Sequence, residues 1–294
     1  MGGVVGRVAQ GLGAVKAHAP LAATASVAGA RMPFLLGGCE VGSVARVHLP
    51  LLAEHPDLIE LREDAVAWIG SPERRNADFD RLHRLWRAQG EILAWRDETY
   101  AIVDPSTLRE LARIERAASR FWGTLTFGAH ATGYVAGADR RPESLWIAQR
   151  SFSKSTDPGL FDNLIGGGVA QGQSAAEALV REGFEEAGLS PAQLAGMRAA
   201  SVLRVARDIP EGFQHEWVHA FDVELPAGLV PQNQDGEVAG FSLLPAAAAM
   251  DLACGSAMTV DSALVTLDFG LRHGLIADAE LDACIRNLRV IRSC

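Results

Sequence analysis

Basic residues, cysteines and long apolar runs are all scarce in this sequence of 294 residues. Lys and Arg total 27 against 36 Asp and Glu, so the formal charge of -9 leaves no broad basic surface that could bind nucleic acid through counterion release. No stretch approaches the roughly eighteen continuous apolar residues that cross a bilayer. We therefore expect neither nucleic acid nor a membrane as a partner.

The four cysteines are Cys39, Cys254, Cys284 and Cys294. They form no CxxC pair and no ligand spacing, which argues against a zinc site and against a disulfide framework. A reducing environment suits them, so we expect a cytoplasmic protein. Because the chain is acidic, a phosphorylated small-molecule substrate would be repelled unless divalent cations intervened, and the composition therefore favours a metal for such a substrate.

The length and the apolar content of 48% predict two domains. Residues 1–31 are rich in Ala, Gly and Val, and we expect a disordered segment or a wrongly assigned start there, with Met32 as the first residue. Residues 32–120 are expected to form a small α+β domain. Residues 121–294 are expected to form the second domain, because the pattern changes from helical to strand-like at 122–127.

Patterns in the first domain predict both kinds of element. Strands are expected at 33–36, 41–47, 91–95 and 100–103. Asn76 is predicted to cap a helix that Gly90 ends. A second helix is predicted to open at Asp104 and Pro105, with Leu108, Leu111 and Ile114 in step.

The second domain alternates strands with helices. Strands are expected at 145–149, 201–205, 216–225 and 238–243. Two amphipathic helices follow, one lined by Val260, Leu264, Leu267 and Leu271 and ended by Gly274, and one lined by Leu281, Ile285 and Leu288. A mixed sheet covered by helices is the expected result, an α+β class overall.

The most informative stretch is GGGVAQGQSAAEALVREGFEEAGL, residues 166–189. Ser174 and Glu177 form a capping box that starts a helix, and Gly188 stands at its expected left-handed end. In that helix Glu182, Glu185 and Glu186 are spaced i, i+3 and i+4, so their carboxylates project from one face.

Two interpretations compete for these three acids. A solvated acidic face is the usual fate of charges on a surface helix. Three like charges near a helix C-terminus, however, repel one another and oppose the macrodipole. A carboxylate triad with loop carbonyls from Gly166 to Gly168 would suit Mg²⁺ or Mn²⁺, which take oxygen ligands. We favour the metal site.

The order of Gly167, Arg181, Glu182, Glu185, Glu186, Gly188 and Leu189 resembles the Nudix box. The resemblance implies the Nudix α/β/α sandwich with a mixed sheet. It also implies a hydrolase that cuts a diphosphate bond with Mg²⁺ or Mn²⁺, held by the three glutamates and the carbonyl at Gly167, while Arg181 orients Glu182. One of these acids, or a neighbour, would deprotonate the attacking water, and the sequence does not identify which.

Two positions depart from the box. Gln173 stands where the pattern usually has a glutamate, which removes one carboxylate. Gly183 replaces a bulky aliphatic residue, at a cost of up to about 1 kcal/mol in helix propensity relative to Ala, and close packing of the helix on the sheet would explain it. Neither departure touches the three acids, so we favour an active enzyme over a noncatalytic ligand-binding module.

A wider resemblance covers roughly residues 33–275. The phrases LWIAQRS, DNLIGGG, NQDGEVAGF and LDFGLRHG resemble the Nudix subgroup related to thiamine diphosphate. That likeness implies removal of a phosphate from thiamine diphosphate or its oxidised forms, with the monophosphate and inorganic phosphate as products. Another Nudix substrate, such as ADP-ribose or a dinucleotide, is the nearest alternative.

Further site residues remain open at this point. Glu237 matches a position that often adds a carboxylate to the cations, although an exposed acid after a turn explains it equally well. Arg150 and Lys154 follow a strand and could contact a diphosphate, or be solvated. Aromatic walls for the organic group could come from Trp122, Phe127, Trp146, Phe161 or Trp217, although core packing is the expected role of most of them. The first domain could complete the pocket or form a homodimer contact.

Overall fold

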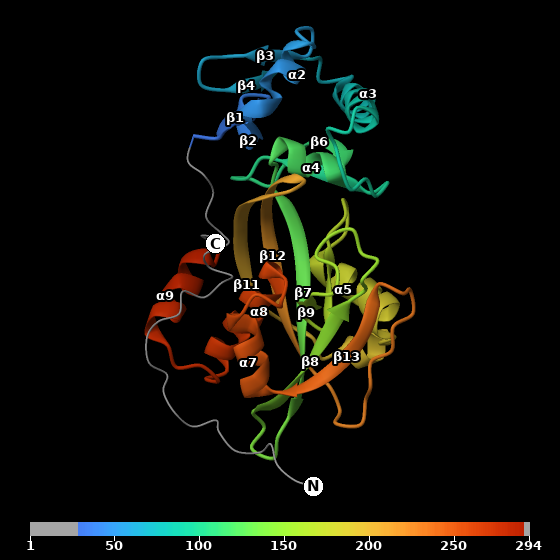
Figure 1. Ribbon diagram of the computed structural model, residues 1–294, viewed down its shortest axis with the longest axis vertical. Coiled ribbons are helices and arrows are strands. Elements are labelled where there is room, and N and C mark those ends of the chain that lie inside the picture. The colour runs from blue at the N-terminus through green and yellow to red at the C-terminus, as the bar shows by residue number, and fades with distance from the viewer. Residues whose placement is uncertain (1–28, 291–294) are drawn as a thin grey trace.

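A computed structural model describes residues 29–290 of the chain and divides them into an upper N-terminal region and a larger C-terminal region (Figure 1). The predicted segment 1–31 therefore lies almost wholly outside the described residues. The N-terminal region runs from β1 to α4, with bounds β1 Arg31–Leu36, β2 Cys39–Ala45, η1 Arg46–His48, α2 Leu49–Ala53, β3 Ile59–Leu61, β4 Val66–Trp68, α3 Arg75–Ala88, β5 Thr99–Val103, β6 Glu110–Glu115 and α4 Arg116–Trp122.

The N-terminal region is built around aromatic side chains. Its four-stranded sheet has the order β2-β1-β4-β3, with β1 and β4 parallel, and β5 pairs with β6 in a separate ladder. Phe34 from β1 stacks on Trp122 from α4 with ring centroids 4.2 Å apart, and Phe79 and Trp86 from α3 are fully buried beside them. These rings hold both helices against the sheet.

Three local predictions for this region were wrong. No helix opens at Asp104, because its carboxylate accepts hydrogen bonds from the backbone and hydroxyl of Ser106 and closes a turn. Strand β6 follows instead. Residues 91–95 form no strand. Asn76 is not the cap of α3, whose cap residue is Arg74; its side chain accepts a hydrogen bond from the Arg113 backbone on β6 at 2.9 Å.

The C-terminal region is a mixed sheet with helices on both faces, as predicted. Strands follow the order β11-β12-β7-β8-β13, with β7 and β12 parallel, while β10 pairs with β7 and β9 with β8. The bounds are β7 Thr126–Ala136, β8 Pro142–Arg150, β9 Phe161–Asp162, β10 Ile165–Gly168, α5 Ala175–Ala187, α6 Pro191–Leu194, β11 Arg198–Ile209, β12 Gly212–Glu224, β13 Val238–Pro245, α7 Ala246–Cys254, α8 Val260–Arg272 and α9 Ala279–Leu288.

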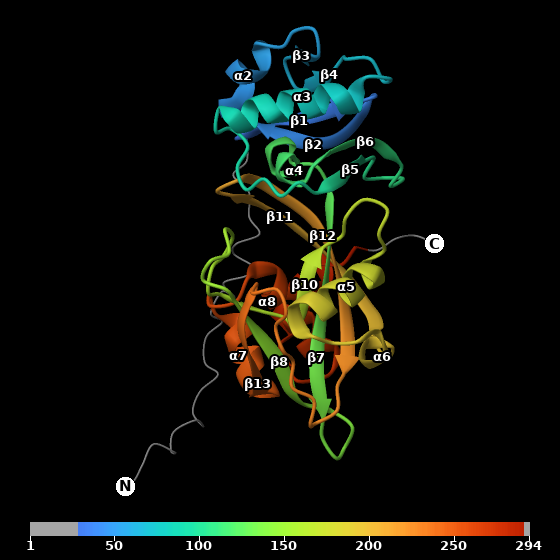
Figure 2. The same ribbon diagram turned by 90° about the vertical axis from the view of Figure 1, so that its right-hand side faces the viewer.

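Two apolar cores flank this sheet. One joins it to α7, α8 and α9, and includes Leu145, Leu264 and Ile285. The other lies under α5 and α6 on the opposite face, and includes Leu179 and Leu194 (Figures 1 and 2). The α+β architecture with a helix-covered mixed sheet is thereby confirmed. Among residues 29–290, no helix is long and apolar enough to span a bilayer.

Candidate active site

A cavity of about 680 Å³ lies where the two regions meet. Helix α4, the long hairpin of β11 and β12, strand β10 and helix α5 converge around it (Figure 2). The structure brings to its walls all the residues predicted to act in catalysis, metal binding or diphosphate binding, namely Arg150, Lys154, Gly167, Arg181, Glu182, Glu185, Glu186 and Glu237.

Helix α5 presents the acids and is held by local signals. Ser174 caps it by accepting from the Glu177 backbone, the glutamate side chain reciprocates, and Gly188 ends it at φ +64°. A β-carbon at Gly183 would meet Leu194 at 2.7 Å and Ile165 at 2.9 Å. The unusual glycine of the motif therefore lets the helix pack closely against α6 and β10.

The three glycines of β10 each make room for a different side chain. A β-carbon at Gly166 would meet the His130 ring at 2.9 Å, one at Gly167 would collide with the Glu182 carboxylate, and one at Gly168 would collide with the Tyr100 hydroxyl. Residues 166–168 belong to a strand paired with β7, not to the loop that we expected. The glycine run thus lets an acid of α5 and a tyrosine of the N-terminal region approach one backbone.

Glu186 is the most deeply buried of the three acids, with 6% exposure. Burial raises its pKa to about 8, against the attraction of Lys154, whose Nζ lies 3.5 Å from Oε1. The Gly166 backbone donates to Oε2 at 3.3 Å. Burial likewise raises the pKa of Glu182, which pairs with Arg181 at 2.8 Å. Two carboxylates that repel each other therefore share one wall with a lysine.

Glu185 and Glu237 lie at the more open side of the cavity and are paired. Arg181 bonds Glu185 at 2.9 Å, and Lys154 contacts Glu237 at 2.6 Å. Although burial opposes it, the hydrogen bond and charge of Lys154 hold the pKa of Glu237 below its usual range. Lys154 therefore bridges Glu237 and Glu186, whereas Glu185 pairs with Arg181.

The donor chemistry of this wall fits a hard divalent cation. Within residues 29–290, no group of three or more His, Cys, Asp or Glu side chains is arranged to hold a metal by itself. The buried Glu186 and the partly buried Glu182 nevertheless provide oxygen ligands whose mutual repulsion a cation would relieve. A third carboxylate would come from Glu185 or Glu237 by exchange of an ion pair.

The Arg150 guanidinium forms its hydrogen bonds with other groups of the protein. It bonds Asp162 at 2.7 Å and the carbonyl oxygens of Thr156 and Asp157 at 2.8 Å and 3.1 Å. These bonds fix the loop that carries Lys154. A direct contact between Arg150 and substrate stays a prediction, whereas its role in placing that lysine is visible.

Sequence comparisons assign the region around this site. Residues 127–258 match the family described as the NUDIX domain, and residues 15–126 match a domain of unknown function, DUF4743. The part of the chain that carries α5 and its acids is therefore similar to the NUDIX domain. The predicted division at residue 120 lies near the point where the two matches meet, and it stays a prediction.

Curated relatives that match more than two thirds of the chain include two plant proteins. Nudix hydrolase 24, chloroplastic, from Arabidopsis thaliana is 35% identical over 71% of this chain and 57% of its own length. Nudix hydrolase 20, chloroplastic, from the same plant is 35% identical over 75% of this chain and 59% of its own length. The chain thus spans less than two thirds of these relatives. Their names support the prediction of a Nudix hydrolase that acts on diphosphate bonds.

Solved structures with a related fold are more distant. DR0079 from Deinococcus radiodurans matches with 22% identity and a TM-score of 0.43, over 57% of this chain and 97% of its own. The NUDIX domain of Shewanella oneidensis NrtR, solved as a cocrystal with ADP ribose, matches with 14% identity and a TM-score of 0.39, over 51% of this chain and 88% of its own.

The sequence did not reveal the wall that faces the acids across the cavity of about 680 Å³. Polar side chains from distant segments line it, namely Arg96, Glu98, Arg116, Arg120, Arg207, Gln214, Glu216 and Asp261. The only available signal was two polar residues, Gln214 and Glu216, at alternate positions of a buried strand. None of the five aromatic residues considered for stacking lines the cavity.

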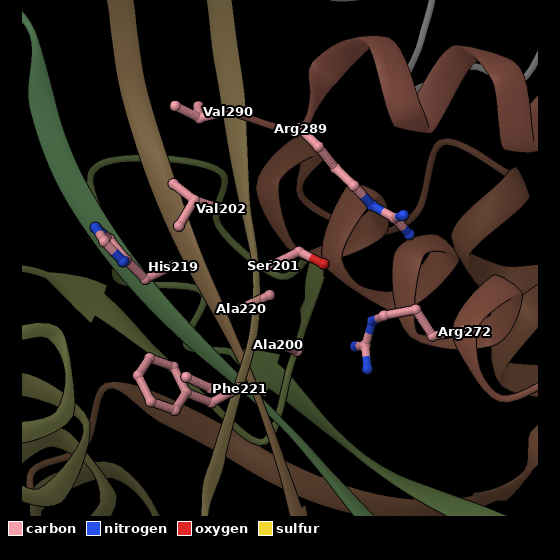
Figure 3. Close-up of a pocket in the computed structure, with 10 residues that line it drawn as sticks. Ala200, Ser201, Val202, His219, Ala220, Phe221, Arg272, Arg289 and Val290 are labelled. Carbon is pink, nitrogen blue, oxygen red and sulfur yellow. The ribbon is translucent and has the colours of Figure 1, made fainter. Parts of the chain in front are cut away.

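A second cavity, of about 430 Å³, lies beside the bulge of β11 and contains Arg272 and Arg289 (Figure 3). Both arginines bond the fully buried Asp268, and Arg272 also forms two bonds with Asp222. Their charge is neutralised within the protein. We therefore assign the chemistry to the larger cavity.

Proposed function

We propose that this chain hydrolyses thiamine diphosphate, or its oxidised and damaged forms, to the monophosphate and inorganic phosphate, using Mg²⁺ or Mn²⁺. One observation carries the proposal: helix α5 places the buried Glu186 and the partly buried Glu182 together, with Lys154, on the wall of the cavity. That wall can bind a diphosphate only through cations, because its acids would otherwise repel the substrate.

The residues that would hold the cations are Glu182 and Glu186, joined by Glu185 or Glu237 and by the backbone carbonyl at Gly167. When bound, such cations neutralise charge on the diphosphate and acidify a water molecule for attack on phosphorus. The protein contributes position and a site shielded from bulk water.

The chain's own groups divide the remaining work. Arg181 contacts both Glu182 and Glu185, so it holds these two acids in register along the helix. Lys154 contacts Glu186 at 3.5 Å and Glu237 at 2.6 Å, and it can turn from Glu237 to a phosphate oxygen. Glu185, the more exposed acid at 44% side-chain exposure, is placed to accept a proton from water.

The organic half of the substrate is proposed from the wider resemblance. Phrases on β8, β10, β13 and α8 resemble the thiamine-related subgroup, and three of them lie beside the cavity, where they contribute Arg150, Asp162 and Glu237. The names of the plant relatives specify no substrate. A substrate panel must therefore decide this point.

The test compares initial rates of the full chain on oxothiamine diphosphate, thiamine diphosphate and ADP-ribose, in Mg²⁺, in Mn²⁺ and in EDTA. We expect kcat/KM for a thiamine-type diphosphate to exceed that for ADP-ribose at least tenfold, with phosphate and the monophosphate as products and no turnover in EDTA. Preference for ADP-ribose would overturn the thiamine assignment. Absence of cleavage for all three would favour a noncatalytic module.

A further inference from the structure

Arg96, in the region that matches DUF4743, lines the cavity and has no acid partner there. It is exposed, and its Nη2 atom donates to the hydroxyl of Ser155 at 2.9 Å. It forms no ion pair with an acid among residues 29–290. A guanidinium carries several N–H donors, and one bond to a neutral hydroxyl leaves most of them, and the whole charge, to a ligand in the cavity.

The other cations at the cavity differ from Arg96 in this respect. Five of them have an acid within 3.5 Å, namely Arg116, Arg120, Arg150, Lys154 and Arg181. Arg207 has no such acid among the described residues, but it is half-buried and donates from Nε to the Gln214 side chain at 2.7 Å. Arg96 is therefore the exposed cavity cation whose charge the described part of the chain does not balance.

Arg96 lies beside the groups that are proposed to meet the phosphates. Its partner Ser155 directly follows Lys154, whose ammonium contacts Glu186 and Glu237. Although burial raises the pKa of Glu237, the hydrogen bond and charge of Lys154, and after them the charge of Arg96, lower it. The guanidinium is thus close enough for its charge to act on an acid of the metal-binding side.

The loop that carries Arg96 is held in an unusual backbone conformation. Ala94 and Asp97, on either side of it, have φ of +56° and +60°, the left-handed region that side chains other than glycine rarely adopt. The Trp95 indole donates to the Asp97 carboxylate at 2.7 Å, and the Arg96 backbone donates to Glu115, the cap of α4, at 2.9 Å. These bonds fix the base of the Arg96 side chain, which reduces the entropy that binding a ligand would cost.

We propose that Arg96 binds the diphosphate of the substrate by donating from its guanidinium to non-bridging phosphate oxygens. The planar fork of a guanidinium matches a phosphate in both geometry and charge. A phosphate oxygen is a stronger acceptor than the neutral hydroxyl of Ser155, so Arg96 exchanges one for the other at little cost, while Lys154 takes a neighbouring oxygen. The inference rests on the proposed function, because it concerns the diphosphate of the same substrate. It makes the region that matches DUF4743 a part of the site.

Binding of methylenediphosphonate tests this inference without turnover, because carbon replaces the bridging oxygen that hydrolysis would release. Isothermal titration calorimetry of the full chain in excess Mg²⁺ gives its Kd. We expect Arg96→Gln to bind the diphosphonate about tenfold or more weakly than the wild type, as for the loss of charge-assisted hydrogen bonds. Arg96→Lys keeps the charge and loses the fork, so it should bind at least about threefold more weakly, also if Arg96→Gln fails to fold.

Ser155→Ala separates ligand binding from a role in holding the loop of Lys154. It removes the one hydrogen bond that the Arg96 side chain forms within the described chain, and it keeps the guanidinium. We expect its Kd to stay within about twofold of the wild type. Arg113→Gln changes an arginine of β6 that pairs with Glu110 at 2.7 Å and does not line the cavity, so this matched control should keep the wild-type Kd. Thermal unfolding of each variant verifies folding.

Equal Kd values for the wild type and Arg96→Gln would overturn the inference, and so would a wild type that binds no diphosphonate in Mg²⁺. Equal losses in Arg96→Gln and Ser155→Ala would also overturn it, because a role limited to holding the loop predicts that result. Weaker binding by Arg96→Gln in a chain that cleaves no thiamine-type diphosphate would support the inference and refute the proposed function. Cleavage of such a diphosphate with an unchanged KM in Arg96→Gln would do the reverse.

Discussion

The N-terminal core and the NUDIX cavity each bury an ionisable side chain, and they do so differently. His83 is fully buried among aromatic rings, where Trp122 donates to its Nε2 at 2.8 Å, and burial lowers its pKa to about 3. Glu186 is 6% exposed in the cavity wall, and burial raises its pKa to about 8. In both places burial favours the neutral form.

The surroundings of the two groups explain why one is structural and the other is suited to chemistry. The neutral ring of His83 accepts a hydrogen bond inside a packed core with no space for a ligand. Glu186 borders a cavity, with Lys154 on one side and Glu182 as a further acid. A cation entering the cavity would stabilise the ionised form of Glu186, so ligand binding can reverse what burial imposes.

Glu186→Gln should produce the largest effect and should separate the two regions most clearly. It removes a charged oxygen ligand without changing side-chain shape, and we expect kcat to fall by about 10²- to 10⁴-fold, as large a loss as that of a catalytic acid or base. Steady-state phosphate release measures this, with Glu224→Gln, which changes an exposed acid of β12 paired with Arg140 at 3.7 Å, as the control. Activity within threefold of the wild type would contradict the assigned role of Glu186.

At high pH and without metal, Glu186→Gln should be more stable than the wild type. The folded-state pKa of about 8 exceeds the ordinary 4.5, so the folded chain holds a proton that the unfolded chain loses between these values. Stability of the metal-free wild type therefore falls as pH rises through that window, and Glu186→Gln removes this contribution. Urea unfolding at pH 6 and pH 9 in EDTA should show the difference, and an equal slope in both proteins would contradict it.

The N-terminal core should respond to pH in the opposite direction. Because the folded-state pKa of His83 is lowered from 6.5 to about 3, its contribution to stability is complete above pH 6.5 and is lost as pH falls toward 3. At pH 5 we expect a loss of about 2 kcal/mol in unfolding free energy, from roughly 1.4 kcal/mol per unit. Urea unfolding measures it, and His83→Gln, which retains an acceptor for Trp122 without titrating, should show a flatter acid slope. An unchanged slope would assign the effect to other groups.

Local signals in the sequence were enough to predict helix α5 and the acids on it. The capping box at Ser174, the stop at Gly188 and the glutamate spacing all act within a few turns of one helix. The helix predicted at 104–115 was wrong because this segment pairs with β5 as a strand. Ala112 and Ile114 are buried at alternate positions, which is a strand period, whereas the apolar residues at 108, 111 and 114 have helical spacing. Helix α7 was not predicted, and α4 was covered only by the helical pattern expected before residue 122.

Only one of the two cavity walls could be predicted from the sequence, because only that wall is built from local signals. The acidic wall comes from one motif and its flanking strands, so its residues could be named. The opposite wall depends on Arg120 meeting Glu216 across 96 positions of sequence, and on Gly128 leaving space for that carboxylate. No periodicity encodes such a contact. Burial of Arg150 against Asp162 is likewise a tertiary outcome.

Gly168→Ala should produce the smallest effect and tests how far the two regions depend on each other. A β-carbon at this position of β10 would collide with the hydroxyl of Tyr100, whose ring is 5% exposed and lies under the Arg116 guanidinium at 5.6 Å. The Tyr100 ring is confined, so we expect a loss of about 1 to 3 kcal/mol, as for an overpacked core. Gly196→Ala, where a β-carbon would meet nothing within 4 Å, should change stability by no more than about 0.5 kcal/mol.

If the two variants unfold at the same urea concentration, Tyr100 does not tie the N-terminal region to the glycine-rich strand. If Gly168→Ala also raises KM more than it lowers kcat, then packing between the regions positions the cavity wall opposite α5, and the acids of α5 keep their catalytic role.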